Sequence, residues 1–110
     1  MALKYIRSFH ETVSAGGYAE IEWTPDEAVK IHRLLITERN GASLNNVQVY
    51  LSTPSMTITR DYAPALYFTN EFQRNQPIDL DVPAGAKIYM KITNNTSSAI
   101  DVDVIFECVY

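Results

Sequence analysis

Two stretches near the C-terminal end of the chain, residues 87–93 and 99–110, alternate between apolar and polar side chains. A period of two is typical of β-strands that bury one face and expose the other to water. The residues between them, 94–98, read Asn-Asn-Thr-Ser-Ser and have the side chains of a turn. We therefore predict an antiparallel hairpin in which Lys91 faces Asp101 on the outer side, while the apolar residues of both strands meet on the inner side.

The rest of the chain contains similar short segments separated by turn residues. In residues 29–38 apolar side chains occupy both odd and even positions. This pattern indicates either a central strand covered on both faces or a β-bulge. Ile6 breaks the alternation of the first expected strand. After the second expected strand, Pro25 is suited to begin a single helical turn capped by Thr24. Besides the two C-terminal strands, we expect strands at residues 4–13, 18–24, 29–38, 47–51, 56–59, 66–68 and 78–82.

The spacing of these segments predicts the fold class. About eight strands at intervals of roughly 8–14 residues, with no long helical pattern, are typical of an all-β sandwich or barrel. We predict an antiparallel β-sandwich with the order of a single jelly roll. An immunoglobulin-type sandwich is the second possibility, although the paired cysteines of that fold are missing. A chain of 110 residues can form one core without disulfides, so residues 1–110 are expected to be one domain.

Charge and hydropathy argue against several kinds of partner. The net charge is −4 with acidic and basic residues interspersed, so no basic stripe is available for nucleic acid. No segment is long and apolar enough for a signal peptide or for a span of a membrane. The single cysteine, Cys108, is in the apolar phase and is expected to be a buried hydrophobe. The overlapping glycosylation sequons at Asn94 and Asn95 are read as turn residues of a chain made in the cytosol.

The sequence offers few groups for catalysis or metal binding. His10 and His32 are the only histidines, and neither has a partner at a metal-ligand spacing. No nucleophile motif and no phosphate-binding loop occurs. We therefore predict a protein that is not an enzyme and that carries no cofactor or metal. Three acidic pairs are each too sparse for the six or more oxygen ligands of Ca²⁺: Asp26 and Glu27, Asp79 and Asp81, and Asp101 and Asp103.

Aromatic residues are the best candidates for a binding surface. Tyr50, Tyr67 and Tyr89 fall on the outward phase of their expected strands, Tyr62 lies in a loop, and Trp23 stands near the end of a strand. Exposed aromatic side chains suit either sugar stacking or a protein interface. Tyrosines scattered over a surface give the same pattern, so the three interpretations stay open.

Several segments, in this order along the chain, resemble a known group of proteins. They are Trp23-Thr24-Pro25, residues 31–36 (Ile-His-Arg-Leu-Leu-Ile), residues 47–51 (Val-Gln-Val-Tyr-Leu), residues 77–80 (Pro-Ile-Asp-Leu), residues 83–88 (Pro-Ala-Gly-Ala-Lys-Ile), and a long last strand after Ile92-Thr93-Asn94. The order resembles small jelly-roll structural proteins of virus particles, in particular decoration, cement or minor capsid proteins of tailed phages and related viruses. The resemblance covers nearly the whole chain and consists of a strand and turn pattern.

The resemblance implies a non-enzymatic virion protein that is assembled in the host cytoplasm. It implies a homo-oligomer, often a trimer, that contacts other capsid or tail proteins. A length of 110 residues is short for a shell-forming jelly roll, which favours an accessory role on the capsid or tail surface. The alternative is a carbohydrate-binding module or receptor-binding β-sandwich that stacks a glycan on exposed aromatic residues. A small enzyme is the third possibility, because a fold does not fix a function.

Overall fold

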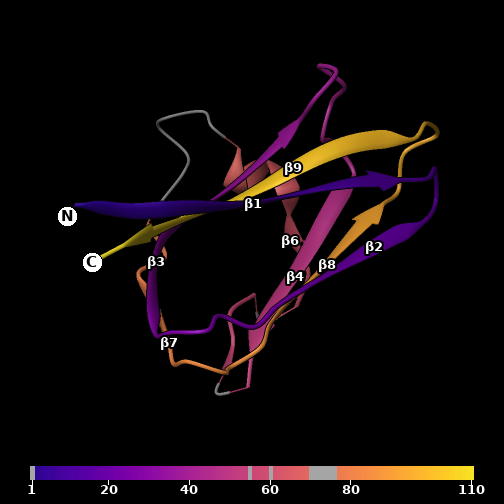
Figure 1. Cartoon of the computed structure of the whole chain (residues 1–110). Helices are drawn as coiled ribbons and strands as arrows, with labels where there is room; N and C mark the ends of the chain where they lie inside the picture. The colour runs from indigo at the N-terminus through magenta and orange to yellow at the C-terminus, as the bar shows by residue number, and fades with distance from the viewer. Residues whose placement is uncertain (1, 55, 60, 70–76) are drawn as a thin grey trace.

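The computed structural model describes residues 2–54, 56–59, 61–69 and 77–110 as two antiparallel sheets packed face to face (Figure 1). One sheet contains, in spatial order, β1 (Leu3–Val13), β9 (Ile100–Val109), β3 (Val29–Glu38) and β7 (Leu80–Val82). The other sheet contains β2 (Tyr18–Trp23), β8 (Ile88–Asn94), β4 (Val47–Thr53) and β5 (Met56–Thr57), and β6 (Ala63–Pro64) also pairs with β4. The predicted all-β sandwich is confirmed.

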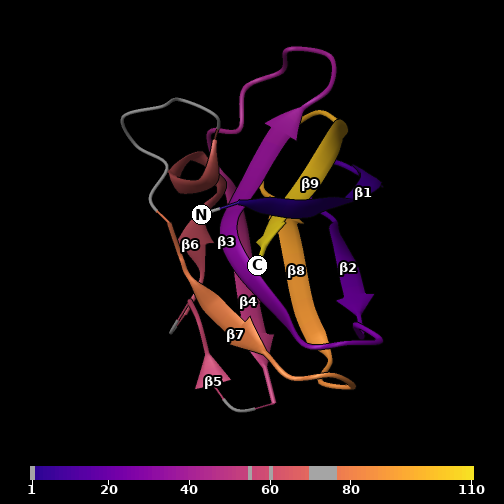
Figure 2. The same cartoon turned by 60° about the vertical axis from the view of Figure 1, so that its left-hand side comes forward.

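The strand order is that of a jelly roll. β5 and β6 pair with opposite ends of β4, so together they take the place of one strand. Counted in this way, the first strand pairs with the last, the second with the last but one, β3 with β7, and β4 with the broken strand. Wrapping one long hairpin into two sheets gives this pairing. Figure 2 shows the short strands β5, β6 and β7 on one side of the molecule, opposite to β2.

The predicted C-terminal hairpin is wrong, although both of its strands exist. β8 pairs with β2 and β4, whereas β9 pairs with β1 and β3 in the opposite sheet. Lys91 therefore lies between Glu20 and Tyr50 in the register, and Asp101 lies opposite Thr12. The apolar faces of β8 and β9 do meet, but across the interior of the sandwich. Alternation determines which face of a strand is buried and carries no information about its hydrogen-bonded neighbour.

A buried asparagine holds the crossing from β8 to β9. The side chain of Asn94 is 0% exposed, and its Nδ2 donates to the carbonyl oxygens of Val13, Ser14 and Ser98 at 3.1, 3.3 and 2.8 Å. Its Oδ1 accepts from the backbone N–H and the hydroxyl of Thr96 at 3.0 and 2.6 Å. Residues 94–98 are therefore fixed to the end of β1 and pass between the sheets, which a hairpin turn does not do.

A β-bulge explains the mixed apolar pattern of β3. The register of β3 against β9 shifts between Ile31 and Arg33, which leaves His32 as the extra residue. Ile31, Leu34 and Ile36 are all 0% exposed although Ile31 has the opposite parity to the other two. An inserted residue reverses the phase of the side chains that follow it, so the bulge is the correct one of the two alternatives.

The segment after β6 differs from the prediction. Residues 66–68 were expected to be a strand, but Ala65–Phe68 forms a 3-10 helix, η1. Its two buried residues, Ala65 and Phe68, are three positions apart, which is the period of a 3-10 helix and not that of a strand. Pro25 begins no helical turn either. The sequence also predicts a polar loop at residues 69–76, most of which lies outside the described residues.

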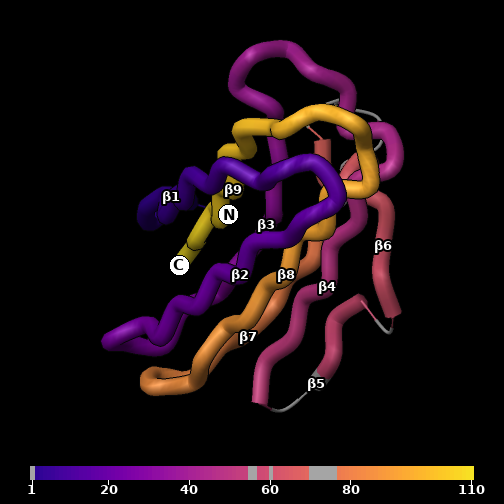
Figure 3. Tube along the Cα trace, turned by 90° about the vertical axis from the view of Figure 1, so that its right-hand side faces the viewer, coloured from indigo at the N-terminus to yellow at the C-terminus, as the bar shows by residue number. Residues whose placement is uncertain are grey.

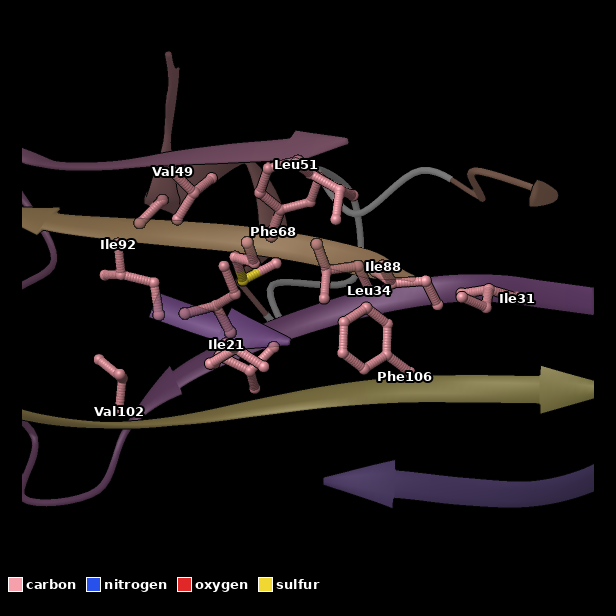
Figure 4. Packing of buried hydrophobic residues seen from close by; sticks show 14 of the residues in the cluster. Ile21, Ile31, Leu34, Val49, Leu51, Phe68, Ile88, Ile92, Val102 and Phe106 are labelled. Atoms are coloured by element: carbon pink, nitrogen blue, oxygen red, sulfur yellow. The ribbon is translucent and has the colours of Figure 1, made fainter. Parts of the chain in front are cut away.

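The core fills the space between the two sheets (Figure 4). Phe106, Leu34 and Ile31 come from one sheet, and Leu51 and Ile88 from the other, and none of them is more than 1% exposed. Burying each such side chain contributes roughly 1.5–3 kcal/mol. Cys108 is also 0% exposed, as its phase predicted. Among the described residues there is no helix with the length and hydropathy to cross a membrane.

Candidate interaction surfaces

Three of the aromatic residues selected from the sequence lie together on the outer face of the sheet that contains β2, β8 and β4. The ring centroids of Tyr50 in β4 and Tyr89 in β8 are 6.1 Å apart, and those of Tyr50 and Tyr62 are 6.0 Å apart. Tyr62 directly precedes β6, whose pairing with β4 brings it beside Tyr50. We call Tyr50, Tyr62 and Tyr89 the tyrosine cluster.

The members of the tyrosine cluster differ in their hydrogen bonding and in the exposure of their rings. The hydroxyl of Tyr89 donates a hydrogen bond of 2.9 Å to Glu20 Oε2 in β2. Burial, together with this hydrogen bond, raises the pKa of Tyr89 to about 12. The phenol therefore stays neutral at physiological pH. Tyr50 and Tyr89 are half-buried and their rings meet at 63°, whereas Tyr62 is 41% exposed and presents the most accessible ring of the three.

Tyr18 extends the aromatic surface on the same sheet face, and the sequence analysis did not select it. Its side chain is 59% exposed, and Lys91 Nζ lies 4.4 Å from its ring centroid in a cation–π contact. Tyr18 shares the outward phase of β2 with Glu20 and Glu22, so the alternation that identified Tyr50 and Tyr89 also marked this residue.

The two remaining aromatic candidates lie elsewhere. Tyr67 is in η1, is 48% exposed and packs with its ring centroid 5.1 Å from that of Phe68. Trp23 is half-buried, with its ring 5.5 Å from Phe106 and 6.3 Å from Phe9. Trp23 therefore belongs to the packing between β1 and β2. Within the described ranges, neither residue has a ring contact with the tyrosine cluster.

The outer face of the opposite sheet carries apolar side chains that were not predicted to form a surface. Ile105 in β9 lies opposite Leu35 in β3, and Ile6 in β1 lies opposite the next outward residue of β9, Glu107. Ile6 is 55% exposed, and Leu35 and Ile105 are half-buried. We call Ile6, Leu35 and Ile105 the outer apolar stripe. The water-facing side of an antiparallel sheet is normally polar, so this stripe is a candidate contact surface.

Acidic residues at one end of the same sheet are occupied by structural hydrogen bonds. Glu38 accepts backbone N–H bonds from Asn40 and Ala42 through Oε1 and from Asp101 through Oε2. Partial burial would raise the pKa of Glu38, but these three donors outweigh it and the pKa is lowered. Asp101 accepts from the Thr12 hydroxyl at 2.6 Å and from Asn40, and these bonds lower its pKa. These carboxylates stabilise the β3–β9 end of the sheet.

The two histidines have single carboxylate partners. His32 Nδ1 lies 2.7 Å from Asp79 Oδ1, and His10 Nε2 lies 3.6 Å from Asp101 Oδ1. No group of three or more His, Cys, Asp and Glu side chains that could hold a metal ion occurs in the described part of the chain. The Thr12 hydroxyl lies beside the His10–Asp101 pair, but it donates its proton to Asp101 Oδ1, so this group has the form of a structural hydrogen bond.

No protein-family model matches this sequence, and no curated protein matches it. Among solved structures, the chain is similar to PliG of Salmonella Typhimurium, a periplasmic inhibitor of g-type lysozyme. The identity is 14%, the match covers 94% of this chain and 87% of that one, and the TM-score is 0.51. It is also similar to the Drosophila NLP core, with 14% identity over 94% of this chain and 98% of that one, and a TM-score of 0.42. At such identity, the likeness to PliG shows the fold alone.

Proposed function

We propose that this chain is a non-enzymatic structural protein of a virus particle, an accessory subunit on the capsid or tail surface. It acts through contacts with copies of itself and with other coat proteins. The observation that carries the proposal is the outer apolar stripe. Ile6 is 55% exposed in the edge strand of a sheet face that also presents Leu35 and Ile105. Burial of such side chains against another protein removes apolar surface from water, which favours association.

The fold and the second outer face support the same proposal. Jelly rolls are a common architecture of viral capsid proteins, although a fold by itself does not fix a function. The tyrosine cluster lies on the face opposite to the stripe, and tyrosine is enriched at protein interfaces. A subunit with contact residues on both outer faces is able to bind a copy of itself on one side and a different coat protein on the other.

The mass of the purified protein in solution tests the oligomeric part of the proposal. One chain has a mass of 12.4 kDa, and we expect light scattering after size-exclusion chromatography to give two or more copies. The melting temperature should rise with protein concentration. Three copies would match the trimer that the family resemblance implies. A monomer at high micromolar concentration, with melting independent of concentration, contradicts the proposal.

A pair of substitutions in β1 tests the outer apolar stripe itself. Ile6→Ser changes a residue that is 55% exposed, so we expect the chain to fold and the oligomer to weaken. Leu3→Ser is the matched control, because Leu3 is 53% exposed in the same strand but lies outside the stripe. Equal effects of the two substitutions on the oligomer would show that the outer apolar stripe is not part of the interface.

The virion location needs a separate experiment. Virus particles purified from the source culture are probed with an antibody raised against this chain. We expect label on the shell or tail of the particles, at a stoichiometry of many copies. Detection of the chain only in the soluble fraction of the same culture contradicts a virion role, whatever the oligomeric state.

The tyrosine cluster favours glycan binding as a second candidate function. Tyr62 presents an exposed ring beside Tyr50, and sugar rings stack on such surfaces. A glycan array and a saccharide-dependent rise in melting temperature measure this activity. Tyr62→Ala should abolish the rise, whereas Tyr67→Ala should keep it, because Tyr67 is similarly exposed but lies outside the cluster. An array without any bound glycan excludes this second function.

A further inference from the structure

β1 is an edge strand of unusual length. It has 11 residues and pairs only with β9 among the described strands, whereas the strand at the opposite edge of the same sheet, β7, has 3. Figure 3 shows that β1 and β2 meet at a shared turn and separate from each other with distance from that turn. The unpaired backbone groups of such an edge are a template for another strand. β1 therefore offers a surface to which a further strand can be added.

The geometry of β1 selects a centre for such an addition. Its register against β9 shifts between Leu3 and Tyr5 and is regular from Tyr5 to Val13. The midpoint of this regular stretch is Phe9. Two copies that pair antiparallel over the whole stretch place Phe9 opposite Phe9 of the second copy, about a two-fold axis. A two-fold contact uses the same patch on both copies, so the patch must be complementary to itself.

The charges of β1 meet this requirement. Arg7 and Glu11 stand two residues to either side of Phe9 and point to the same face as Phe9. In a pair centred on Phe9, Arg7 of each copy lies opposite Glu11 of the other, which gives two contacts of opposite charge. A pair centred on Arg7 or on Glu11 places like charges opposite each other. A pair centred on Ser8 or His10 leaves both charges without an opposite charge.

Arg7 and Glu11 are available for these contacts. Neither takes part in an ion pair among the described residues. Arg7 is exposed, and its guanidinium carbon lies 4.4 Å from the Phe9 ring centroid. It borders a hollow of about 530 Å³ that Asp26 and Glu27 also line. A single charge on the inner face of an edge strand discourages strand pairing. Two opposite charges placed symmetrically about Phe9 instead favour the one register in which they face each other.

We propose that two copies of this chain pair antiparallel through β1, centred on Phe9, and join their β1-β9-β3-β7 sheets into one continuous sheet. The inference rests on the proposed function and deepens it, because it names the contact through which the structural subunit binds a copy of itself. Ile6 lies within the paired stretch, so the outer apolar stripes of both copies lie on the same face of the joined sheet.

Complementary charge reversals test this register. Arg7→Glu and Glu11→Arg each place like charges at both contacts of a pair, so we expect each variant by itself to associate at least about tenfold more weakly than the wild type. A one-to-one mixture of the two variants places opposite charges at both contacts. We expect the mixture to recover the mass of a pair in light scattering, and the double variant Arg7→Glu/Glu11→Arg to recover it without mixing.

Lys87→Glu is the matched control. It makes the same change in net charge as Arg7→Glu, but Lys87 lies next to β8 in the other sheet, so the variant should keep the mass of the pair. Arg7→Glu also loses the contact with the Phe9 ring and places a negative charge beside Asp26, so its melting temperature is measured first. The mixing experiment is insensitive to this loss, because mixing alters neither fold.

Hydrogen exchange of the wild type provides a measurement that needs no variant. Amides of β1 from Tyr5 to Val13 should exchange more slowly at high than at low protein concentration. Exchange that does not depend on concentration overturns the β1 contact, and so does a mixture of the charge variants that stays monomeric. If the wild type is an oligomer in either case, the proposed function stands and its interface lies elsewhere. A wild-type monomer contradicts both proposals.

Discussion

The two sides of the sandwich are closed in different ways. On one side lie β1 and β2, of 11 and 6 residues, which diverge from a shared turn. On the other side lie β7, β5 and β6, of 3, 2 and 2 residues, and the helix η1. Short edge strands expose few unpaired backbone groups, which is one way in which proteins prevent strand addition. The difference supports the proposal that two copies pair through β1 rather than through the short strands.

The interior of the β1 side is also distinctive, because large aromatic rings fill the space between the diverging strands. Phe9 of β1, Trp23 of β2 and Phe106 of β9 contact one another with ring centroids 5.5–6.3 Å apart. A tilted or edge-on pair of rings adds roughly 0.5–1.5 kcal/mol to the burial of its apolar area. We therefore expect β1 and β2 to depend on this aromatic group for their fixed positions.

The largest effect is expected from Phe106→Ala. Phe106 is 1% exposed and contacts rings from both β1 and β2, so its removal should lower the free energy of unfolding by about 3–5 kcal/mol. Phe68→Ala is the matched change near the short strands, where Phe68 is 4% exposed. Urea denaturation measures both losses. Hydrogen exchange of β1 and β2 should accelerate in the first variant only, and equal acceleration in both would contradict the comparison.

Asn94→Ala should have the next largest effect, about 2–3 kcal/mol. The substitution leaves the carbonyl oxygens of Val13, Ser14 and Ser98 without their side-chain donor at a buried site. Asn94→Asp should cost at least as much, because it turns a carboxylate oxygen toward those carbonyls. Thr96→Val removes the hydroxyl's bonds to Asn94 and Ser98 but keeps the Asn94 amide donor, and it should cost about 0.5–1.5 kcal/mol. If Asn94→Asp is as stable as the wild type, the donor role is wrong.

Tyr89→Phe tests the attachment of the other edge strand, β2. The substitution removes the hydrogen bond from Tyr89 in β8 to Glu20 in β2. The folded pKa of Tyr89 is raised from about 10 to about 12, so between these values the folded state keeps a proton that the unfolded chain has lost. The stability that this provides is fully present below pH 10 and is lost as the pH rises toward 12. Chemical denaturation between pH 8 and about 11 should show a steeper decline for the wild type than for Tyr89→Phe, and equal slopes would contradict the assignment.

The sequence located part of the candidate surfaces. Alternation gave the outward phase of Tyr50 and Tyr89, and the same rule applied to β2 would have added Tyr18. Tyr62 was predicted to lie in a loop, but its position beside Tyr50 depends on the pairing of β6 with β4, which are separated along the chain by a segment that includes β5. The outer apolar stripe was not predicted, because Ile6, Leu35 and Ile105 become neighbours only through the β1-β9-β3 register.

The sequence by itself determined the long strands, their buried faces and the all-β class, because these depend on a local period of two and on turn residues. It also marked the irregularity in β3 that is a bulge. Only the tertiary structure decided which strands are neighbours, since β8 and β9 have the alternation of a hairpin and yet lie in opposite sheets. Strand pairing depends on long-range contacts and on bonds such as those of the buried Asn94, and a local pattern contains neither.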